Sequence, residues 1–230
     1  MEPIYAIVRN TLLPLLRLLF RWKIDGIDKI PRTGPAIVAS NHISNFDPLC
    51  VAYLVDRAGR RPRFLAKASL WKNPVMRIIF SGCKQIPVER GTGDVSPTRA
   101  AEQSLRSGEV VVVYPEGTIT TNLDLTPMKG KTGVARLTLA TGVPVTPVAV
   151  WGAQWLIPKG RKWKYRGHRL MMLKVGEPMR FDEFARRQDD PDVLREVTDR
   201  VMAEIDRLVR ELHKIHPDGG AVPELTGAQS

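Results

Sequence analysis

The protein has 230 residues, 43% of them hydrophobic, enough to bury the core of one α/β domain or of two small ones. It carries 35 Lys and Arg against 24 Asp and Glu, a formal net charge of +11, which favours an anionic partner: nucleic acid, an anionic bilayer or a phosphorylated substrate. This composition excludes general disorder. Cys50 and Cys83 form no CxxC pair, and the chain shows no zinc-ligand spacing, so we expect buried thiols in a reducing compartment and no metal site.

The amino-terminal stretch, residues 4–20, predicts an apolar helix that carries Arg9 and Arg17. Two arginines make a bilayer-spanning helix costly, and no signal-peptide cleavage site is visible. Such a helix is typical of the headgroup region of an anionic membrane. Packing on the protein's own core is the alternative, and different faces of the helix can do both. We therefore expect residues 1–23 to form a membrane-interface helix.

After this helix, strands and helices are expected to alternate. Strands are predicted at residues 23–30 (with a turn), 36–39, 64–66, 83–88, 110–114, 143–150 and 170–175, and helices at 48–55, 73–80, 98–107, 130–141 and 192–215. This order predicts a single α/β domain over residues 24–216, with a mixed, mostly parallel central sheet flanked by helices. Residues 217–230 contain few apolar side chains and are expected to form a disordered tail.

The segment Asn41-His42-Ile43-Ser44-Asn45-Phe46-Asp47 follows a predicted buried strand and is the first candidate for catalysis. Histidine titrates near neutral pH, so it can take a proton from a hydroxyl. A carboxylate five residues later, across a turn, can bind the other ring nitrogen and set the tautomer. The alternative is structural, because Asp47-Pro48 is also a good helix start, with Asp47 as the N-cap.

The segment Tyr114-Pro115-Glu116-Gly117-Thr118 follows the strongest predicted strand and is the second candidate. A glutamate at the end of a buried strand points into a loop at the sheet edge, where open α/β sheets place their sites. Glu116 could bind substrate hydroxyls, orient a basic side chain or position a phosphate-binding loop. A plain turn is the alternative, because these residue types are common in turns.

These two segments resemble motifs of the glycerolipid acyltransferase family, which includes the 1-acylglycerol-3-phosphate (lysophosphatidate) acyltransferases. His42 and Asp47 are similar to its His-four-residues-Asp motif, and residues 114–118 to its Phe-Pro-Glu-Gly-Thr motif with one aromatic exchanged. Residues 85–90 resemble the second block, 131–133 a Lys-x-Gly element, and 143–148 the fourth block. All four blocks occur in order within residues 36–152.

The resemblance implies an enzyme that transfers a fatty acyl group from acyl-CoA or acyl-carrier protein to a hydroxyl of 1-acylglycerol-3-phosphate in phospholipid biosynthesis. His42 would act as general base and Asp47 would orient it, without an acyl-enzyme and without a bound cofactor. The oxyanion donor is left open. Another lysophospholipid or a glycolipid is the alternative acceptor, and a non-catalytic basic module that binds membranes or nucleic acid is the second alternative.

The resemblance also implies residues that bind the acceptor. They are Arg90, Glu116, Gly117, Thr118, Lys129 and Lys131. The family motif usually continues with an arginine that helps to bind the acceptor phosphate, whereas this chain has Ile119 there. The departure puts the exact acceptor in doubt and shifts the expected phosphate contact to Arg90, Lys129 and Lys131.

A basic cluster at residues 159–169 contains Trp163 and Tyr165 among its cations. Aromatic side chains among cations suit nucleic-acid stacking or a bilayer interface, and a clamp for the CoA phosphates or a solvated loop are further possibilities. A lipid acceptor favours the bilayer, so we expect no nucleic-acid partner. Together with Arg9 and Arg17, the residues Arg161, Lys162, Trp163 and Lys164 are predicted to hold the enzyme peripherally or monotopically on the cytoplasmic face of the cell membrane.

Overall fold

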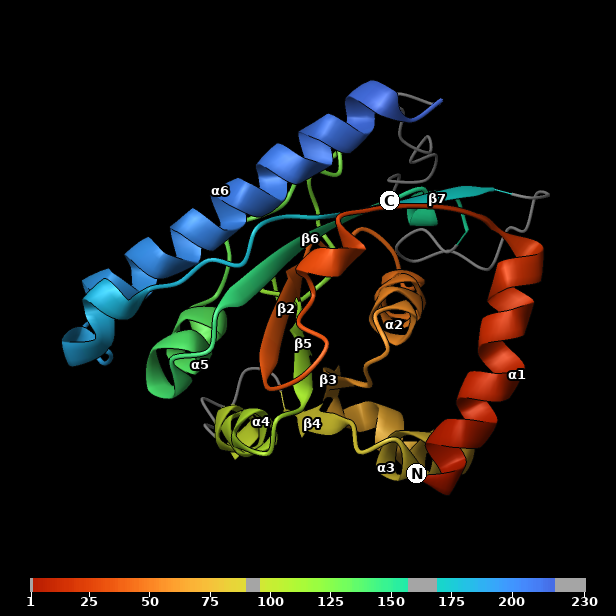
Figure 1. Ribbon diagram of the computed structural model, residues 1–230, viewed down its shortest axis with the longest axis horizontal. Coiled ribbons are helices and arrows are strands. Elements are labelled where there is room, and N and C mark those ends of the chain that lie inside the picture. Colours follow the sequence, from red (N-terminus) through yellow and green to blue (C-terminus); the bar gives the residue numbers. More distant parts are fainter. Residues whose placement is uncertain (1, 90–95, 157–168, 218–230) are drawn as a thin grey trace, which may run out of the picture.

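The computed structural model describes residues 2–89, 96–156 and 169–217 (Figure 1). Its sheet has seven strands in the order β1-β7-β6-β2-β5-β3-β4. The strands are β1 (Arg21–Asp25), β2 (Ala36–Ser40), β3 (Pro62–Lys67), β4 (Ile86–Val88), β5 (Val110–Val113), β6 (Val145–Trp151) and β7 (Leu170–Val175). All neighbouring strands pair in parallel except β6 and β7, so the predicted mixed, mostly parallel sheet is confirmed.

Helices cover both faces of this sheet (Figure 1). The helices are α1 (Pro3–Leu19), α2 (Asp47–Arg57), α3 (Pro74–Gly82), α4 (Ser96–Arg106), α5 (Gly133–Thr141) and α6 (Pro191–Ile215). One core cluster joins the sheet to α4, α5 and α6, and a second joins it to α1 and α2. Strands β2, β5 and β6 are buried along their whole length, as the central strands of a parallel sheet must be.

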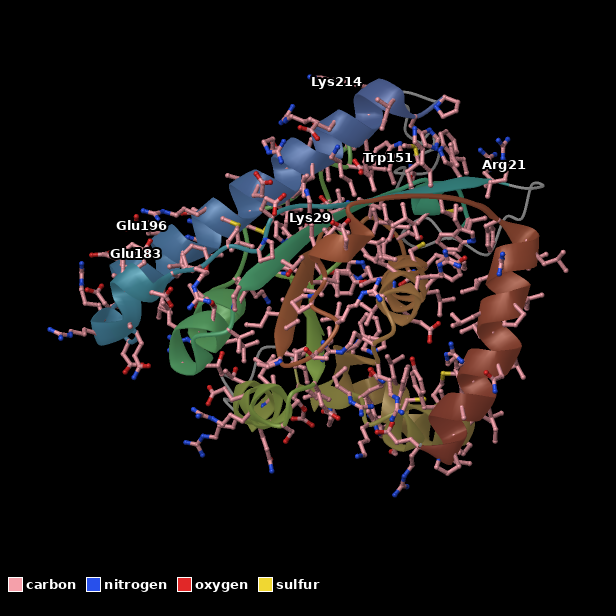
Figure 2. All side chains as sticks on the ribbon, viewed as in Figure 1. Arg21, Lys29, Trp151, Glu183, Glu196 and Lys214 are labelled. Atoms are coloured by element: carbon pink, nitrogen blue, oxygen red, sulfur yellow. The ribbon has the colours of Figure 1, made fainter. Side chains whose placement is uncertain are left out.

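Helix α6 is amphipathic and contributes buried apolar residues along its length, from Val193 to Leu212, to the first cluster. Its outer face is charged: Arg200 bonds to both Glu183 and Glu196, which are labelled in Figure 2. Near its carboxyl end, the ring of His213 lies 3.9 Å from that of Trp151, measured between centroids. The helix therefore lies along β6 and ends near the carboxyl end of that strand.

Several predicted elements are shorter in the structure than expected, and two of them show a physical reason. The strand predicted at 83–88 begins only at Ile86, because Lys84 adopts a left-handed conformation with φ of 51° and Gln85 uses its side chain to bond to Phe64 N–H. The helix predicted at 130–141 begins at Gly133. Gly130 packs against Met202, where a Cβ atom would come within 2.8 Å of a side-chain carbon. Gly130 therefore makes a tertiary contact and lies outside the helix.

Helix α1 packs on the rest of the protein through one face. Tyr5 and Leu16 are buried, and Arg9 forms a 2.5 Å ion pair with Asp56 of α2. At its start, Glu2 binds the buried guanidinium of Arg63 at 2.6 Å. The alternative of packing on the protein's own core therefore holds for this face. Within the described ranges, the structure contains no helix with the length and hydropathy of a membrane span.

The contact between α1 and α3 depends on Gly82, because a Cβ atom there would lie 2.3–2.8 Å from three side-chain carbons of Ile4. We expect Gly82→Ala to lower the free energy of unfolding by about 1–3 kcal/mol through overpacking. Gly133→Ala is the matched control, since a Cβ atom there meets nothing within 4 Å. Urea denaturation of the two variants measures the difference, and equal stabilities would contradict this packing.

Candidate active site

His42 lies at the edge of the sheet where the parallel strands end. Strand β2 lies between β5 and β6, and Ala39 pairs with Val113, so the residues that follow β2 and β5 lie side by side. This register brings His42 next to Glu116. Two segments 74 residues apart in the sequence thus meet at one point, where His42 N–H donates to Glu116 Oε1 over 2.8 Å.

The His42 side chain forms a dyad with Asp47. Nδ1 of His42 lies 2.9 Å from Asp47 Oδ2, and Asp47 is fully buried while the His42 side chain is 12% exposed. The ionised carboxylate can only accept a hydrogen bond, so Nδ1 carries the proton and Nε2 is left with a lone pair. Nε2 forms no hydrogen bond within the described ranges. It is the atom that can remove a proton from a substrate.

Asp47 does not cap helix α2. The helix includes Asp47 as its first residue, and its N-cap position is Phe46, with no side-chain cap. Asp47 Oδ2 instead accepts from the backbone N–H groups of Ile43 and Ser44, at 2.6 and 2.7 Å. The Asp47 side chain therefore holds the loop before the helix. Its role as the N-cap of a helix, the alternative from the sequence, is not what the structure shows. Burial raises the pKa of the Asp47 carboxyl, while the hydrogen bonds from His42, Ser44 and Ile43 act to lower it.

Glu116 joins two loops through the backbone. It is 3% exposed, and its second oxygen, Oε2, accepts from Met128 N–H at 2.9 Å. Burial raises the pKa of Glu116 to about 7, although the hydrogen bonds from Met128 and His42 oppose this shift. The carbonyl of His42 also accepts from Thr120 N–H at 2.7 Å. Both backbone groups of His42 are thus held by the segment that follows β5.

Tyr114, which follows the neighbouring strand β5, and Asn41, which directly precedes His42, support the dyad. The Tyr114 ring stacks on the His42 imidazole, with centroids 4.4 Å apart and planes 26° apart. The Asn41 side chain bonds to both backbone groups of Val150, at 3.0 and 2.8 Å, and so extends the pairing of β2 with β6 by one residue. The sequence interpretation assigned no role to Asn41, although it stands directly before the candidate base.

The predicted acceptor-binding residues Gly117, Thr118, Lys129 and Lys131 lie in the two segments that Glu116 adjoins or bonds to. Gly117 has φ of +71°, and the Lys131 side chain lies across it, with Nζ 3.1 Å from the place a Cβ atom would occupy. Lys131 N–H donates to Pro115 O at 2.8 Å. Thr118, Lys129 and Lys131 are exposed. Ile119, in the place of the motif arginine, is buried with 8% exposure.

Several predicted residues lie away from this site or outside the described residues. Arg9 and Arg17 are exposed on α1. Arg90, Arg161, Lys162, Trp163 and Lys164 lie outside the described residues. Lys67, which the sequence interpretation missed, is an exposed cation at the carboxyl end of β3, three residues after Phe64, which pairs with Val112 of β5. A lysine directly after a predicted strand was the available signal.

Comparison with known proteins identifies the family. A family model described as Acyltransferase matches residues 21–151, more than half of the chain. The chain belongs to the Acyltransferase family. The matched segment begins at β1, ends with β6, and includes His42, Asp47 and Glu116. In the part of the chain that the structure describes, no group of three or more His, Cys, Asp or Glu side chains could hold a metal ion.

One solved structure shares this fold, and several relatives are similar in sequence. The crystal structure of the 1-acyl-sn-glycerophosphate acyltransferase of Thermotoga maritima superimposes with a TM-score of 0.67 at 26% identity, covering 90% of this chain and 82% of that one. The 1-acyl-sn-glycerol-3-phosphate acyltransferase of Bacillus subtilis is 24% identical, over 79% of this chain and 85% of its own. A chloroplastic enzyme of the same name from Brassica napus is 26% identical, over 61% of this chain, but this acyltransferase-family chain spans only 40% of its length.

The buried Glu116 makes stability depend on pH. Its pKa is raised from 4.5 to about 7, so the folded protein keeps a proton that the unfolded chain has lost between these values. This contribution stabilises the fold below the unfolded pKa and is lost as the pH rises through about 7. Between about pH 5 and 8, we expect the wild type to lose on the order of 1–3 kcal/mol of unfolding free energy relative to Glu116→Gln.

Urea denaturation at the two pH values measures this loss. Glu177→Gln is the control, because the side chain of Glu177 is 79% exposed and should change the pH dependence little. Parallel curves for the wild type and Glu116→Gln would contradict a titrating, buried Glu116.

Proposed function

We propose that this protein transfers a fatty acyl group from a thioester to a hydroxyl of 1-acylglycerol-3-phosphate. The observation that carries the proposal is the His42–Asp47 dyad, which leaves Nε2 able to accept a proton at the sheet edge of an Acyltransferase-family domain. The names of the Bacillus subtilis and Thermotoga maritima relatives support this acceptor. Acyl-CoA and acyl-carrier protein are the proposed donors.

The dyad supports direct transfer. His42 Nε2 removes the proton of the acceptor hydroxyl as its oxygen attacks the thioester carbonyl. The tetrahedral intermediate then collapses, the carbon–sulfur bond breaks, and the proton passes from Nε2 to the leaving thiolate. Asp47 stabilises the imidazolium that forms between these steps. These steps need no acyl-enzyme and no bound cofactor. Both cysteines, Cys50 and Cys83, are buried and are not required as nucleophiles.

Cations at the same edge would hold the acceptor phosphate. Because Ile119 is buried where the motif arginine is expected, we assign the phosphate contact to Lys131 and Lys67, with Arg90 and Lys129 as further candidates. A lysine ammonium donates three hydrogen bonds and suits a phosphate as a point charge. Glu116 would act by holding the backbone of His42 and Met128. A different lysophospholipid or a glycolipid stays the alternative acceptor.

The outer surface of α1 and α3 supports attachment to an anionic membrane. These two helices pack together and leave five large apolar side chains between 48% and 70% exposed: Ile7, Leu15, Leu18, Val75 and Ile78. Exposed cations accompany them, namely Arg17, Lys72 and Arg77. Apolar side chains bordered by cations suit the headgroup region. We propose that this surface, which includes α3 as well as the predicted α1, holds the enzyme on the cytoplasmic face of the membrane.

The acyl transfer is tested with purified protein, palmitoyl-CoA, phospholipid vesicles and lysophosphatidate, with monoacylglycerol and other lysophospholipids as parallel acceptors. We expect His42→Ala to lower kcat/KM at least about 1,000-fold, and Asp47→Asn about 100- to 10,000-fold, because the amide cannot balance an imidazolium charge. Transfer to another acceptor would change the substrate but keep the dyad. Full activity of folded His42→Ala would exclude His42 as the general base. No transfer by the wild type would favour a non-catalytic binding module.

Membrane attachment is tested by co-sedimentation with vesicles that contain anionic phospholipid. We expect the double variant Ile7→Ser and Leu18→Ser to lower the partition coefficient about tenfold or more, since each substitution removes a large apolar contact. Ile215→Ser is the control, because Ile215 is 51% exposed at the far end of α6. If both proteins lose binding equally, the surface of α1 and α3 is not the site of contact.

A further inference from the structure

Two buried polar atoms of residues that contact the His42 imidazole form no hydrogen bond within the described ranges. They are Asp47 Oδ1 and the hydroxyl oxygen of Tyr114. Asp47 Oδ2 accepts three hydrogen bonds, whereas Oδ1 accepts none. Asp47 Oδ1 is an acceptor, and the Tyr114 hydroxyl is a donor. Buried polar groups in folded proteins are almost always paired, directly or through an internal water molecule.

The two atoms belong to neighbouring groups. The Tyr114 ring stacks on His42 at 4.4 Å between centroids, and the same imidazole bonds to Asp47 over 2.9 Å. Burial raises the pKa of Tyr114 well above its usual value, and the charges of Asp47 and then Cys50 add to this effect. The hydroxyl therefore keeps its proton and can donate it to a hydrogen bond. The Asp47 carboxylate lies within electrostatic reach.

Other groups around the pair compete poorly for either atom. Cys50 is buried on α2, one turn after Asp47, and burial raises its pKa well above normal, with Asp47 adding to the shift. Its thiol is a weak donor. Glu116, the remaining acid at this edge, has both carboxylate oxygens occupied by backbone N–H groups. Phe64, whose ring lies nearly parallel to that of Tyr114, is apolar.

We propose that Tyr114 is a positioning residue of the dyad, whose hydroxyl donates to Asp47 Oδ1 through one internal water molecule. This chain has tyrosine where the family motif has phenylalanine, so the hydroxyl is an addition to the motif. The bridge pairs both buried atoms and stabilises the charge of Asp47 while His42 holds the substrate proton. Its effect on rate rests on the proposed acyl transfer, but its effect on the dyad does not.

Tyr114→Phe tests the bridge, because it removes the hydroxyl and keeps the stacked ring. We expect kcat to fall roughly tenfold with KM for lysophosphatidate and palmitoyl-CoA within about twofold, the size expected for a lost hydrogen bond to a charged group. Without this donor the Asp47 carboxylate is less stabilised, so the dyad holds its proton more tightly. In the plot of kcat against pH, the fall in activity on the acid side (the acid limb) should therefore move to higher pH.

Tyr53→Phe is the matched control. Tyr53 is a buried tyrosine of α2 that stacks on Trp22, with centroids 4.1 Å apart. Its hydroxyl is not part of the proposed bridge, so its loss should leave the acid limb where it is in the wild type. A shift of the same size in both variants would overturn the assignment to Tyr114.

A second measurement does not depend on turnover. Proton NMR follows the His42 Nδ1–H signal, which is assigned by its loss in His42→Ala, and we expect this signal to shift in Tyr114→Phe but not in Tyr53→Phe. An unchanged signal together with an unchanged acid limb would overturn the proposal. A lower kcat alone, with both of these unchanged, would also overturn the bridge, because the hydroxyl would then affect the rate without acting on the dyad. If the wild type transfers no acyl group, the proposed function fails, and the NMR comparison still decides on the bridge.

Discussion

One carboxylate oxygen, Asp47 Oδ2, holds the loop on which the active site depends. It accepts from the imidazole of His42 and from the backbone N–H groups of Ile43 and Ser44. Three donors that converge on a buried oxygen offset the cost of removing a carboxylate from water. The same contacts fix the imidazole tautomer, because Nδ1 must donate. Nε2, the proposed base, is therefore oriented by contacts of Asp47, the first residue of α2.

Neighbouring strands restrict His42 as well. Glu116 and Thr120, both after β5, bond to its N–H and C=O groups, and Asn41 connects the preceding residue to Val150 of β6. The imidazole itself is stacked by Tyr114. The proposed base is thus held by contacts from two neighbouring strands, so it has little freedom left to lose when a substrate binds, which is the condition for preorganised catalysis.

Helix α1 connects the sheet with the outer surface. Its inner face is joined to β3 through Glu2 and Arg63 and to α2 through Asp56, while Ile7 and Leu18 remain outside. The exposed Lys67 lies at the far end of the same strand β3. Because α1 is fixed to the two elements that also border the site, any surface that receives its apolar side chains would be held at a constant orientation to His42.

The sequence by itself determined the order of strands and helices, the mixed sheet and the two candidate residues of the dyad. These features depend on local patterns: β-branched runs such as residues 110–113, helical spacing along α6, and a histidine and an aspartate five residues apart at the end of a strand. Local patterns did not set the boundaries near residues 83–85 and 130–132. There, Gln85 and Gly130 make contacts with Phe64 and Met202 that decide the backbone path.

Only the tertiary structure decided the roles of individual side chains. Asp47 could cap a helix or orient His42; in the folded loop its side chain bonds to His42 and does not cap α2. Glu116 could reach substrate or backbone; the pairing of β2 with β5 placed His42 N–H against one of its oxygens, and the segment after β5 placed Met128 N–H against the other. The parallel pairing of β3 with β5 placed Lys67 at the edge of the sheet where His42 lies. A residue's partners depend on strands far away in sequence, because strand order and register set distances that no local pattern contains.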